Sequence, residues 1–419
     1  MKVKLSLGII LLVILILFSP LLVSTGAVNG LPPGRSSTVV VAAANATAIE
    51  KLQADYICPV QSCLTELNNA VVALPGKGGS IHLSSGIISL ASGETWTITK
   101  NVALQGSGKG YYYPSGESTT LYKIGAGDAL VFEGNHNITV SVRDLTIQKE
   151  DNTTWANGDG IKLVKVNDFL LDNIQVDSAG GVGINVLASW GGMIQNSIIR
   201  HSSSYGIYYG KAGAELTTAQ RLFNNHLGAN TNYDVYIDSA LGINITENHF
   251  EQYSSSENFI YIDNASVVIE ANYFSASYPG TKGVYAHSGN VKFLNNTIGG
   301  DYDYGYDAMY GLHTIIGNHF QGLNHNAAIR INDWLDSAIV ANNYFVVGTN
   351  YAMLLYGPSA LISVTGNIIK KQGGSGLLNV IQSNGQGVIS ANTFYSPPQY
   401  GSLGIIAPNA LVVNNYGIQ

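Results

Sequence analysis

The stretch of sequence that decides the fold is one repeat at residues 248–274, which reads NHFEQYSSSENFIYIDNASVVIEANYF. It begins and ends with the same phrase, an asparagine followed by a variable residue and an apolar residue. Asp172 opens the series, Asn415 closes it, and the span between them is 243 residues over ten steps, a mean of about 24. The phrase starts at Asn196, Asn225, Asn248, Asn272, Asn296, Asn318, Asn343, Asn367 and Asn392. One long step, between Asn196 and Asn225, indicates an inserted loop at residues 212–220.

A repeat of this length is too short for paired helices and leaves leucine-rich repeats or a β-helix. The leucine spacing of the first class is absent, and apolar residues alternate at period two, as in Val235 and Ile237. Short strands and tight turns follow, and stacked coils pair each strand with its equivalent about 4.8 Å away. The repeated asparagines then form a ladder at one turn. The sequence therefore predicts an all-β, single-stranded parallel β-helix with about 24 residues per coil.

The N-terminal residues indicate export. Lys2 and Lys4 precede an apolar run at residues 5–23, and small residues follow at 25–27, as in a secretory signal. The run is also long enough to remain as an uncleaved anchor, which is the one route to a membrane that we expect. We assign residues 1–27 to this signal or anchor, 28–55 to a linker with a short helical segment at 48–53, and 56–419 to the β-helix. A secreted or cell-surface protein is expected.

Other features suit an oxidising exterior. Cys58 and Cys63 lie five residues apart, which favours a disulfide over a metal pair because no further cysteine or histidine has zinc spacing. Six acceptor sites for N-glycosylation are present, at Asn45, Asn137, Asn152, Asn244, Asn264 and Asn295.

Composition excludes several classes of protein. Only 11% of residues are charged and the formal net charge is −7, so the chain lacks the basic surface of a nucleic-acid binder. It is too apolar and aromatic to be disordered, with 46% hydrophobic residues and 25 tyrosines. Any acidic polysaccharide would need a local arginine, lysine or metal site.

Several segments carry a family resemblance: residues 64–70, the Gly-rich turn and strand at 75–83, residues 101–108 with a Gly-x-Gly turn, and the phrase NGDGI at 157–161. Together they resemble the pectate-lyase-like (pectin lyase fold) right-handed parallel β-helix superfamily. The resemblance covers nearly all of the mature chain, and it implies a right-handed solenoid with an N-terminal capping helix. The superfamily includes lyases, hydrolases, epimerases, phage tailspikes and adhesins, so the resemblance specifies the fold and leaves the chemistry open.

The family's catalytic motifs are mostly missing. Polygalacturonase-like hydrolases carry Asp-Asp and Gly-His-Gly motifs that this chain lacks, and Arg330-Ile331-Asn332 replaces their Arg-Ile-Lys. No arginine stands beside the acidic calcium ligands that the calcium-dependent lyases use. The missing motifs weaken both the assignment to polygalacturonase-like hydrolases and the assignment to calcium-dependent lyases.

Strand periodicity predicts an outward tyrosine column. The first apolar residue of each Gly-Ile-like strand should point inward, at Ile161, Ile184, Ile207, Val235, Ile260, Val284, Met309, Ile329 and Met353, so that the next residue points outward. On five consecutive coils that next residue is a tyrosine, namely Tyr208, Tyr236, Tyr261, Tyr285 and Tyr310. On the coil after these it is Arg330. Such a strip would bind sugar rings by face contact; the alternative is a purely structural aromatic ladder.

Two residues farther along, the outward column places Asp238 and Asp263 on adjacent coils, with His287 on the next. Carboxylates about 5 Å apart could share a proton, hold Ca²⁺, or act as the acid and nucleophile of a retaining glycosidase. His287 would orient the pair or act as a base. The structural alternative is a set of turn-end carboxylates facing solvent. Ca²⁺ is the one cofactor left open, and no metal site is assigned.

Two classes of function remain. The first is an extracellular polysaccharide lyase or glycoside hydrolase with a glycan along the outer face of the β-helix. The second is a non-catalytic glycan-binding adhesin or cell-envelope protein that uses the same surface. Only four residues follow Asn415, so no C-terminal capping helix is encoded, and we expect an oligomer or another partner to cover that end.

Overall fold

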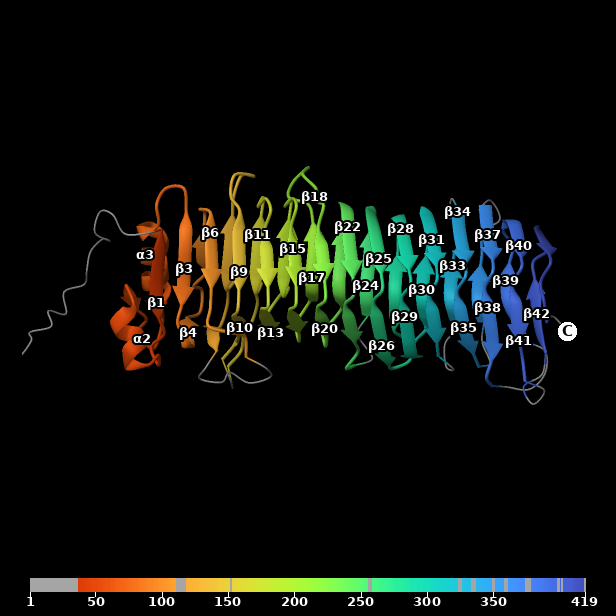
Figure 1. The fold of residues 1–419 in the computed structure, drawn as a ribbon, viewed down its shortest axis with the longest axis horizontal. Coiled ribbons are helices and arrows are strands. Elements are labelled where there is room, and N and C mark those ends of the chain that lie inside the picture. The colour runs from red at the N-terminus through yellow and green to blue at the C-terminus, as the bar shows by residue number, and fades with distance from the viewer. Residues whose placement is uncertain are drawn as a thin grey trace, which may run out of the picture. The chain divides into compact units, whose positions relative to one another are not determined.

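The structure is a computed structural model that describes residues 37–419, apart from residues 111–117, 151–152, 255–257, 323–325, 333–336, 349–350, 358–360, 374–377, 398–399, 401 and 418–419. Residues 36–419 form one compact unit (Figure 1). The signal or anchor predicted at residues 1–27 lies outside the described residues. Within the described part of the chain, no helix is both long and apolar enough to cross a membrane.

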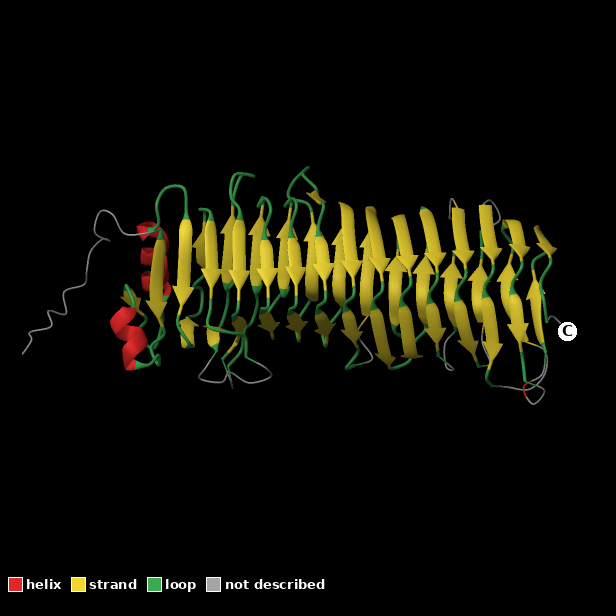
Figure 2. Cartoon of the chain, in the orientation of Figure 1, coloured by secondary structure: helices red, strands yellow, loops and turns green. Residues whose placement is uncertain are grey.

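The described strands form three parallel sheets that run the length of the solenoid, which Figure 2 shows as rows of arrows. Sheet A holds β1 (Thr38–Ala42), β2 (Tyr56–Ile57), β3 (Gly79–Leu83), β6 (Val102–Gln105), β9 (Val140–Arg143), β12 (Leu170–Asp172), β15 (Met193–Gln195), β18 (Thr217–Thr218), β19 (Arg221–Phe223), β22 (Ala240–Thr246), β25 (Ala265–Glu270), β28 (Gly289–Leu294), β31 (Leu312–Ile316), β34 (Ser337–Ala341), β37 (Leu361–Thr365), β40 (Gln386–Ser390) and β43 (Ala410–Val413).

Sheet B holds β4 (Gly86–Leu90), β7 (Thr119–Lys123), β10 (Thr146–Lys149), β13 (Gln175–Asp177), β16 (Ile198–Arg200), β20 (His226–Gly228), β23 (His249–Glu251), β26 (Tyr273–Ser277), β29 (Thr297–Asp301), β32 (His319–Gln321), β35 (Tyr344–Val347), β38 (Ile368–Lys371) and β41 (Thr393–Tyr395). Sheet C holds β5 (Trp96–Ile98), β8 (Leu130–Glu133), β11 (Ile161–Val164), β14 (Ile184–Leu187), β17 (Tyr205–Gly210), β21 (Tyr233–Asp238), β24 (Asn258–Asp263), β27 (Lys282–Ala286), β30 (Tyr304–Ala308), β33 (Ala327–Ile331), β36 (Tyr351–Leu355), β39 (Leu378–Ser383) and β42 (Leu403–Ile406). The predicted β-helix is confirmed.

Two short helices stand at the N-terminal end. α2 (Ala48–Gln53) begins at a capping box in which Thr47 and Glu50 bond to each other's backbone N–H groups. α3 (Leu64–Ala73) buries Leu67 and Val71 and packs against β1, β2 and β5, so the capping helix implied by the resemblance is present. The expected disulfide joins Cys58 to Cys63, directly before α3.

The prediction of a linker at residues 28–55 is wrong from Thr38 onward. β1 pairs in register with β3, so the solenoid begins at Thr38. The physical reason is a short alternation, in which Val39 and Val41 point into the core and are fully buried. In the sequence this alternation is hidden by the surrounding alanines and serines.

The core is a set of apolar columns, because each inward side chain stacks on its equivalent in the next coil. Ile161, Ile184, Ile207, Val235 and Ile260 are all fully buried and successive in register. Aromatic residues stack in the same way: the rings of Phe250 and Phe274 lie 4.7 Å apart and nearly parallel.

The asparagine ladder occupies the turn between sheets A and B. Each buried asparagine accepts a hydrogen bond from the backbone N–H of the previous ladder asparagine, as from Asn272 to Asn296 Oδ1 at 2.9 Å. Its own amide donates to backbone carbonyls of the previous coil, as from Asn296 Nδ2 to Ile269 O at 2.9 Å. The bonds run unbroken from Asn225 to Asn415.

The residue before each ladder position has a left-handed backbone, as at Glu247, Ala271 and Asn295. Non-glycine residues occupy this conformation at a cost of about 1–2 kcal/mol, which the ladder bonds offset. Gly317 and Gly366 occupy the same turn on two coils, where an added Cβ atom would lie 2.3–2.4 Å from the Oδ1 of the asparagine one coil earlier and would force that side chain to move. Register also shows that Asn196 aligns with Asn224, and that Ser197 takes the first ladder position in place of an asparagine.

The ladder gives a first prediction. Asn296→Ala should lower the free energy of unfolding by about 3 kcal/mol, because it leaves the Asn272 N–H and the Ile269 carbonyl buried without partners. The measurement is urea unfolding followed by circular dichroism. Asn290→Ala, on the exposed face of β28, is the matched control and should change stability little. Equal effects for the two variants would contradict the role of the ladder.

Candidate functional site

Four of the predicted tyrosines form a continuous column on sheet C. Tyr208, Tyr236, Tyr261 and Tyr285 pair in register on β17, β21, β24 and β27, and each is partly exposed. Ring centroids are 5.6 Å apart for Tyr208 and Tyr236, and 4.5 Å apart for Tyr236 and Tyr261. Tyr285 turns its ring so that it meets Tyr261 edge to face. The column is a packed aromatic ladder on the outer surface.

A second row of tyrosines flanks the column and was not predicted. Tyr205 lies 4.5 Å from Tyr236, and Tyr233 lies 5.3 Å from Tyr261, between ring centroids. Strict alternation would place Tyr205 inside, but Gly206 and Ile207 are consecutive buried residues, so Tyr205 and Tyr208 both face outward. Gly206 precedes the apolar residue on β17, but Asp234 takes that position on β21, so the sequence carries no consistent signal of this break in alternation.

The rings cover one another's faces, so face contact with sugars is not available along the middle of the column. Tyr236 and Tyr261 are within 12° of parallel at 4.5 Å, which leaves their edges and hydroxyl groups for a ligand. Burial, with help from neighbouring tyrosines and carboxylates, raises the pKa of Tyr208 and of Tyr233 to about 12 and raises that of Tyr261. The hydroxyl groups therefore stay protonated and can donate hydrogen bonds.

The prediction that Tyr310 continues the column is wrong. β30 ends at Ala308, and the residue paired with Tyr285 is Asp307. Tyr306 takes the inward position that was assigned to Met309, and it is fully buried with its hydroxyl 2.7 Å from His313 Nδ1. In the sequence, Tyr306 is not recognisable as a buried residue, because tyrosine is usually partly exposed. The inward position was therefore expected three residues later, at Met309.

Asp238, Asp263 and His287 lie together as expected. Asp238 and Asp263 are direct register partners on β21 and β24, and His287 follows β27 one coil later. His287 Nδ1 lies 2.9 Å from Asp263 Oδ1, which also accepts a hydrogen bond from Ser288 Oγ at 2.6 Å. Asp238 accepts one from Ser239 Oγ at 2.8 Å. The arrangement is a carboxylate–imidazole pair with a second carboxylate on the preceding coil.

The charge state of Asp263 is set by these partners. Partial burial opposes its ionisation, but the hydrogen bonds from Ser288 and His287 outweigh that effect and lower the pKa of Asp263 below its ordinary value. The side chains of Asp263 and His287 are 34% and 38% exposed, so both are open to solvent. An ionised Asp263 favours the His287 tautomer with its proton on Nδ1, which leaves Nε2 able to accept a proton.

A cationic cluster continues the face toward the C-terminus. Buried Asp307 accepts two hydrogen bonds from Arg330, at 2.8 Å from Nε and 2.5 Å from the second nitrogen, and pairs with Lys282 Nζ at 3.2 Å. Lys282 lies over the ring of Tyr285 at 3.8 Å, and Arg330 over the ring of Tyr304 at 3.7 Å. Two cations share one carboxylate, so the cluster keeps a net positive charge beside the tyrosines.

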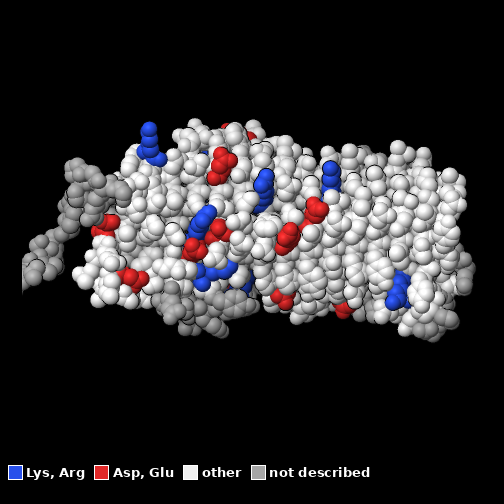
Figure 3. Space-filling view, viewed as in Figure 1, with Lys and Arg blue, Asp and Glu red and all other residues white. Residues whose placement is uncertain are grey.

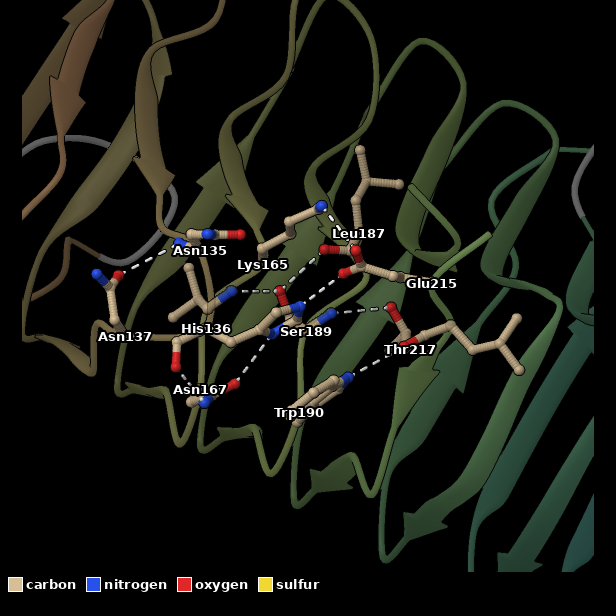
Figure 4. A network of polar contacts seen from close by, with 12 residues as sticks. Asn135, His136, Asn137, Lys165, Asn167, Leu187, Ser189, Trp190, Glu215 and Thr217 are labelled. Atoms are coloured by element: carbon tan, nitrogen blue, oxygen red, sulfur yellow. Dashed lines mark hydrogen bonds and ion pairs between the residues drawn. The ribbon is translucent and has the colours of Figure 1, made fainter. Parts of the chain in front are cut away.

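A polar network lies along the edge where sheet C turns into sheet A (Figure 4). Glu215, in the predicted inserted loop, reaches back to His136 at 2.7 Å and to Lys165 at 2.9 Å. The indole of Trp190 stacks on His136 at 3.9 Å and is 43% exposed. Asp238, Asp263 and His287 lie on later coils of the same edge, so Trp190 and the carboxylate–imidazole pair follow one line along the solenoid.

The fold and these contacts can be compared with known proteins. A family model described as a right-handed β-helix region matches residues 128–298. This match covers less than half of the chain, and it agrees with the parallel β-helix fold that the three sheets show. A search of curated proteins by sequence found no match.

Three similar solved structures illustrate the fold. The A-module of the mannuronan C-5 epimerase AlgE6 of Azotobacter vinelandii is 14% identical with a TM-score of 0.55, covering 86% of this chain and 96% of that one. DFA-IIIase of Arthrobacter chlorophenolicus A6 in complex with DFA-III is 15% identical with a TM-score of 0.52, covering 80% and 95%. The alginate lyase of Paenibacillus sp. str. FPU-7 is 15% identical with a TM-score of 0.50, covering 70% and 98%. At these identities the likeness shows the fold alone.

The predicted glycosylation sites that the structure describes lie on the surface. Asn45, Asn137, Asn244, Asn264 and Asn295 are exposed, whereas Asn152 lies outside the described residues. Asn264 directly follows Asp263, so a glycan there would stand beside the carboxylate–imidazole pair. Among the described residues, no group of three or more histidine, cysteine or acidic side chains has a geometry that could hold a metal ion.

The partners of Asp263 give the second prediction. His287→Ala should raise the Asp263 pKa toward the ordinary carboxyl value of about 3.9, because the charge-favouring hydrogen bond is lost. The stabilisation from ionised Asp263 is present above that ordinary value and disappears as the pH falls through its lowered native pKa. Carboxyl carbon NMR titration of ¹³C-aspartate-labelled protein measures the shift, with His319→Ala on sheet B as the control. An unchanged Asp263 pKa in His287→Ala would contradict the pairing.

Proposed function

We propose that this β-helix is an extracellular polysaccharide lyase that binds a uronate-containing glycan along the tyrosine face of sheet C. The observation that carries the proposal is the contact of 2.9 Å between His287 Nδ1 and Asp263 Oδ1, at the edge of a row of protonated tyrosine hydroxyls. The names of the similar structures, which include a mannuronan epimerase and an alginate lyase, agree with a polysaccharide substrate.

The chemistry assigned to the pair is general base catalysis. His287 Nε2 takes the C5 proton of a uronate unit, and the electron pair left on C5 forms a C4=C5 double bond. The C4–O4 bond breaks, and O4 takes a proton from the hydroxyl of Tyr261, whose ring centroid lies 6.4 Å from that of His287. Asp263 holds the imidazole tautomer and stabilises the imidazolium that forms.

Two features favour this elimination over the retaining hydrolase considered from the sequence. A retaining hydrolase needs one carboxyl group that is protonated at working pH; the pKa of Asp263 is lowered, so Asp263 does not supply that acid and is better placed as the ionised partner of His287. In addition, Lys282 and Arg330 leave a net positive charge near Tyr285 that suits the carboxylate of a uronate unit. Asp238 then helps to position the substrate through its place beside Asp263.

The third prediction tests the chemistry. His287→Gln should lower kcat on a panel of uronate polysaccharides by about 10²- to 10⁴-fold, since a positioned general base contributes that much. Asp263→Asn should also lower it, by removing the ionised partner of His287. Formation of the unsaturated product is followed by ultraviolet absorbance, with a reducing-end assay run in parallel. Glu133→Gln, at the exposed end of β8, is the matched control.

Two outcomes would reject the lyase assignment. Reducing ends that appear without the ultraviolet signal would identify a hydrolase. Binding without turnover would identify the adhesin alternative.

The fourth prediction concerns binding by the tyrosine face. Because the rings present hydroxyl groups, Tyr236→Phe should weaken glycan affinity about three- to tenfold, the equivalent of one hydrogen bond. Tyr344→Phe on sheet B is the control and should have no effect. Calorimetric titration with a substrate oligosaccharide on the His287→Gln background measures both. Full affinity in Tyr236→Phe, with loss only in Tyr236→Ala, would instead indicate contact through the ring.

The export, glycosylation and association of the chain are part of the same proposal. The five exposed acceptor asparagines and the Cys58–Cys63 disulfide support a secreted or cell-surface location. Attachment to a membrane would require the N-terminal segment to stay uncleaved. Association through the C-terminal end stays a prediction, with exposed Leu411 on β43 as a candidate contact.

A further inference from the structure

A cleft of about 510 Å³ lies at the end of sheet B, away from the tyrosine column. Lys149, Ser178 and His201 form one wall, directly at the ends of β10, β13 and β16. Because the preceding residues Gln148 and Asp177 are register partners, these three side chains occupy one position on three successive coils. Trp155 and neighbouring threonines of the following loop form the opposite wall.

His201 is held in this wall by a buried carboxylate. Its Nδ1 lies 3.0 Å from Asp177 Oδ1, and the side chain of Asp177 is only 12% exposed. Arg200 Nε donates to Asp177 Oδ2 at 2.8 Å, and Ser178 Oγ donates to Oδ1 at 2.8 Å. Burial opposes ionisation of Asp177, but these partners prevail and lower its pKa. The ionised carboxylate orients the imidazole, which is 48% exposed, so that Nε2 remains available to a ligand.

Lys149 supplies a cation to the same wall. Its side chain is exposed, and no described residue forms an ion pair or hydrogen bond with it. Cations are scarce in this protein, with 20 lysines and arginines in 419 residues, and Figure 3 shows that on the face drawn most charged side chains gather over the N-terminal half. Asp177 is already paired with Arg200 at 2.8 Å, so Lys149 is the exposed cation of this wall that a ligand can reach. Glu150, which follows Lys149, is the nearest carboxylate in sequence.

We propose that this cleft is a second glycan-binding site, specific for a sugar unit that carries a carboxylate or a sulfate ester. Lys149 Nζ pairs with the anionic group, while His201 Nε2 and the hydroxyls of Ser178 and Ser203 bond to sugar hydroxyl groups. Trp155 also lines the site; it is largely buried, and its indole N–H is already bonded to Gly127 O at 3.0 Å. The inference takes its class of ligand from the proposed function, but none of its residues belongs to the sheet C site.

The test separates the two sites by measuring binding on a Tyr236→Ala, His287→Gln background, where the sheet C site is impaired. The probes are an oligogalacturonate, a chondroitin sulfate oligosaccharide and neutral maltohexaose. Lys149→Gln should weaken binding of an anionic probe by about fivefold or more, because a charged partner is lost, and Lys149→Arg should retain it. Lys292→Gln, an exposed lysine on β28, is the control.

Each outcome decides the assignment. Weakening with the oligogalacturonate alone identifies the carboxylate as the ligand, weakening with the sulfated probe alone identifies the sulfate, and weakening with both identifies any anionic sugar. Equal weakening with maltohexaose would overturn the requirement for an anion. Unchanged binding of every probe by Lys149→Gln would overturn the site, whatever the activity of His287 variants shows about sheet C.

Discussion

The parallel hydrogen-bonded pairing of each strand with its equivalent in the next coil is the constraint on which the rest of this structure depends. Pairing without slippage turns residues about 24 apart in sequence into neighbours about 4.8 Å apart. The inward columns build the core, and the outward columns build the surfaces at which a ligand can bind. The asparagine ladder fixes this register, since every buried amide bonds to the coil before it and to the coil after it.

The same pairing explains why two carboxylate–imidazole pairs occur on different sheets. Asp263 ends β24 and His287 follows β27, while Asp177 ends β13 and His201 follows β16. In both cases the histidine stands one coil after the aspartate, and a serine hydroxyl shares the same carboxylate oxygen. The two sites differ in their surroundings: one faces a row of tyrosines, and the other a cleft that an exposed lysine lines.

The sequence was enough to predict this fold, the disulfide, and the juxtaposition of Tyr236 with Tyr261 and of Asp238 with Asp263, because all of these follow from a fixed period and alternating strands. It was not enough where the chain departs from alternation. Tyr205 and Tyr233 each precede two buried residues in a row, and Tyr306 is an inward tyrosine whose hydroxyl bonds to His313. The Lys149–His201 wall was missed because its members come from strands of three or four residues with little periodicity, and only the observed register unites them.

The left-handed turn before the ladder makes the coils unequal as building blocks. Where Asn295 and Asn342 direct their side-chain oxygens toward the next coil, that coil has glycine, at Gly317 and Gly366, where an added Cβ atom would lie 2.3–2.4 Å from the oxygen. At the equivalent turn after Asn196 the next coil has Asn224, whose amide donates to Asn196 Oδ1 at 2.8 Å. The residue at this turn is therefore matched to the asparagine one coil earlier, either by leaving room for its oxygen or by bonding to it. Recombination that exchanged, duplicated or deleted single coils would separate such matched residues, so the array should tolerate editing better in blocks that keep each of these asparagines with its partner on the next coil.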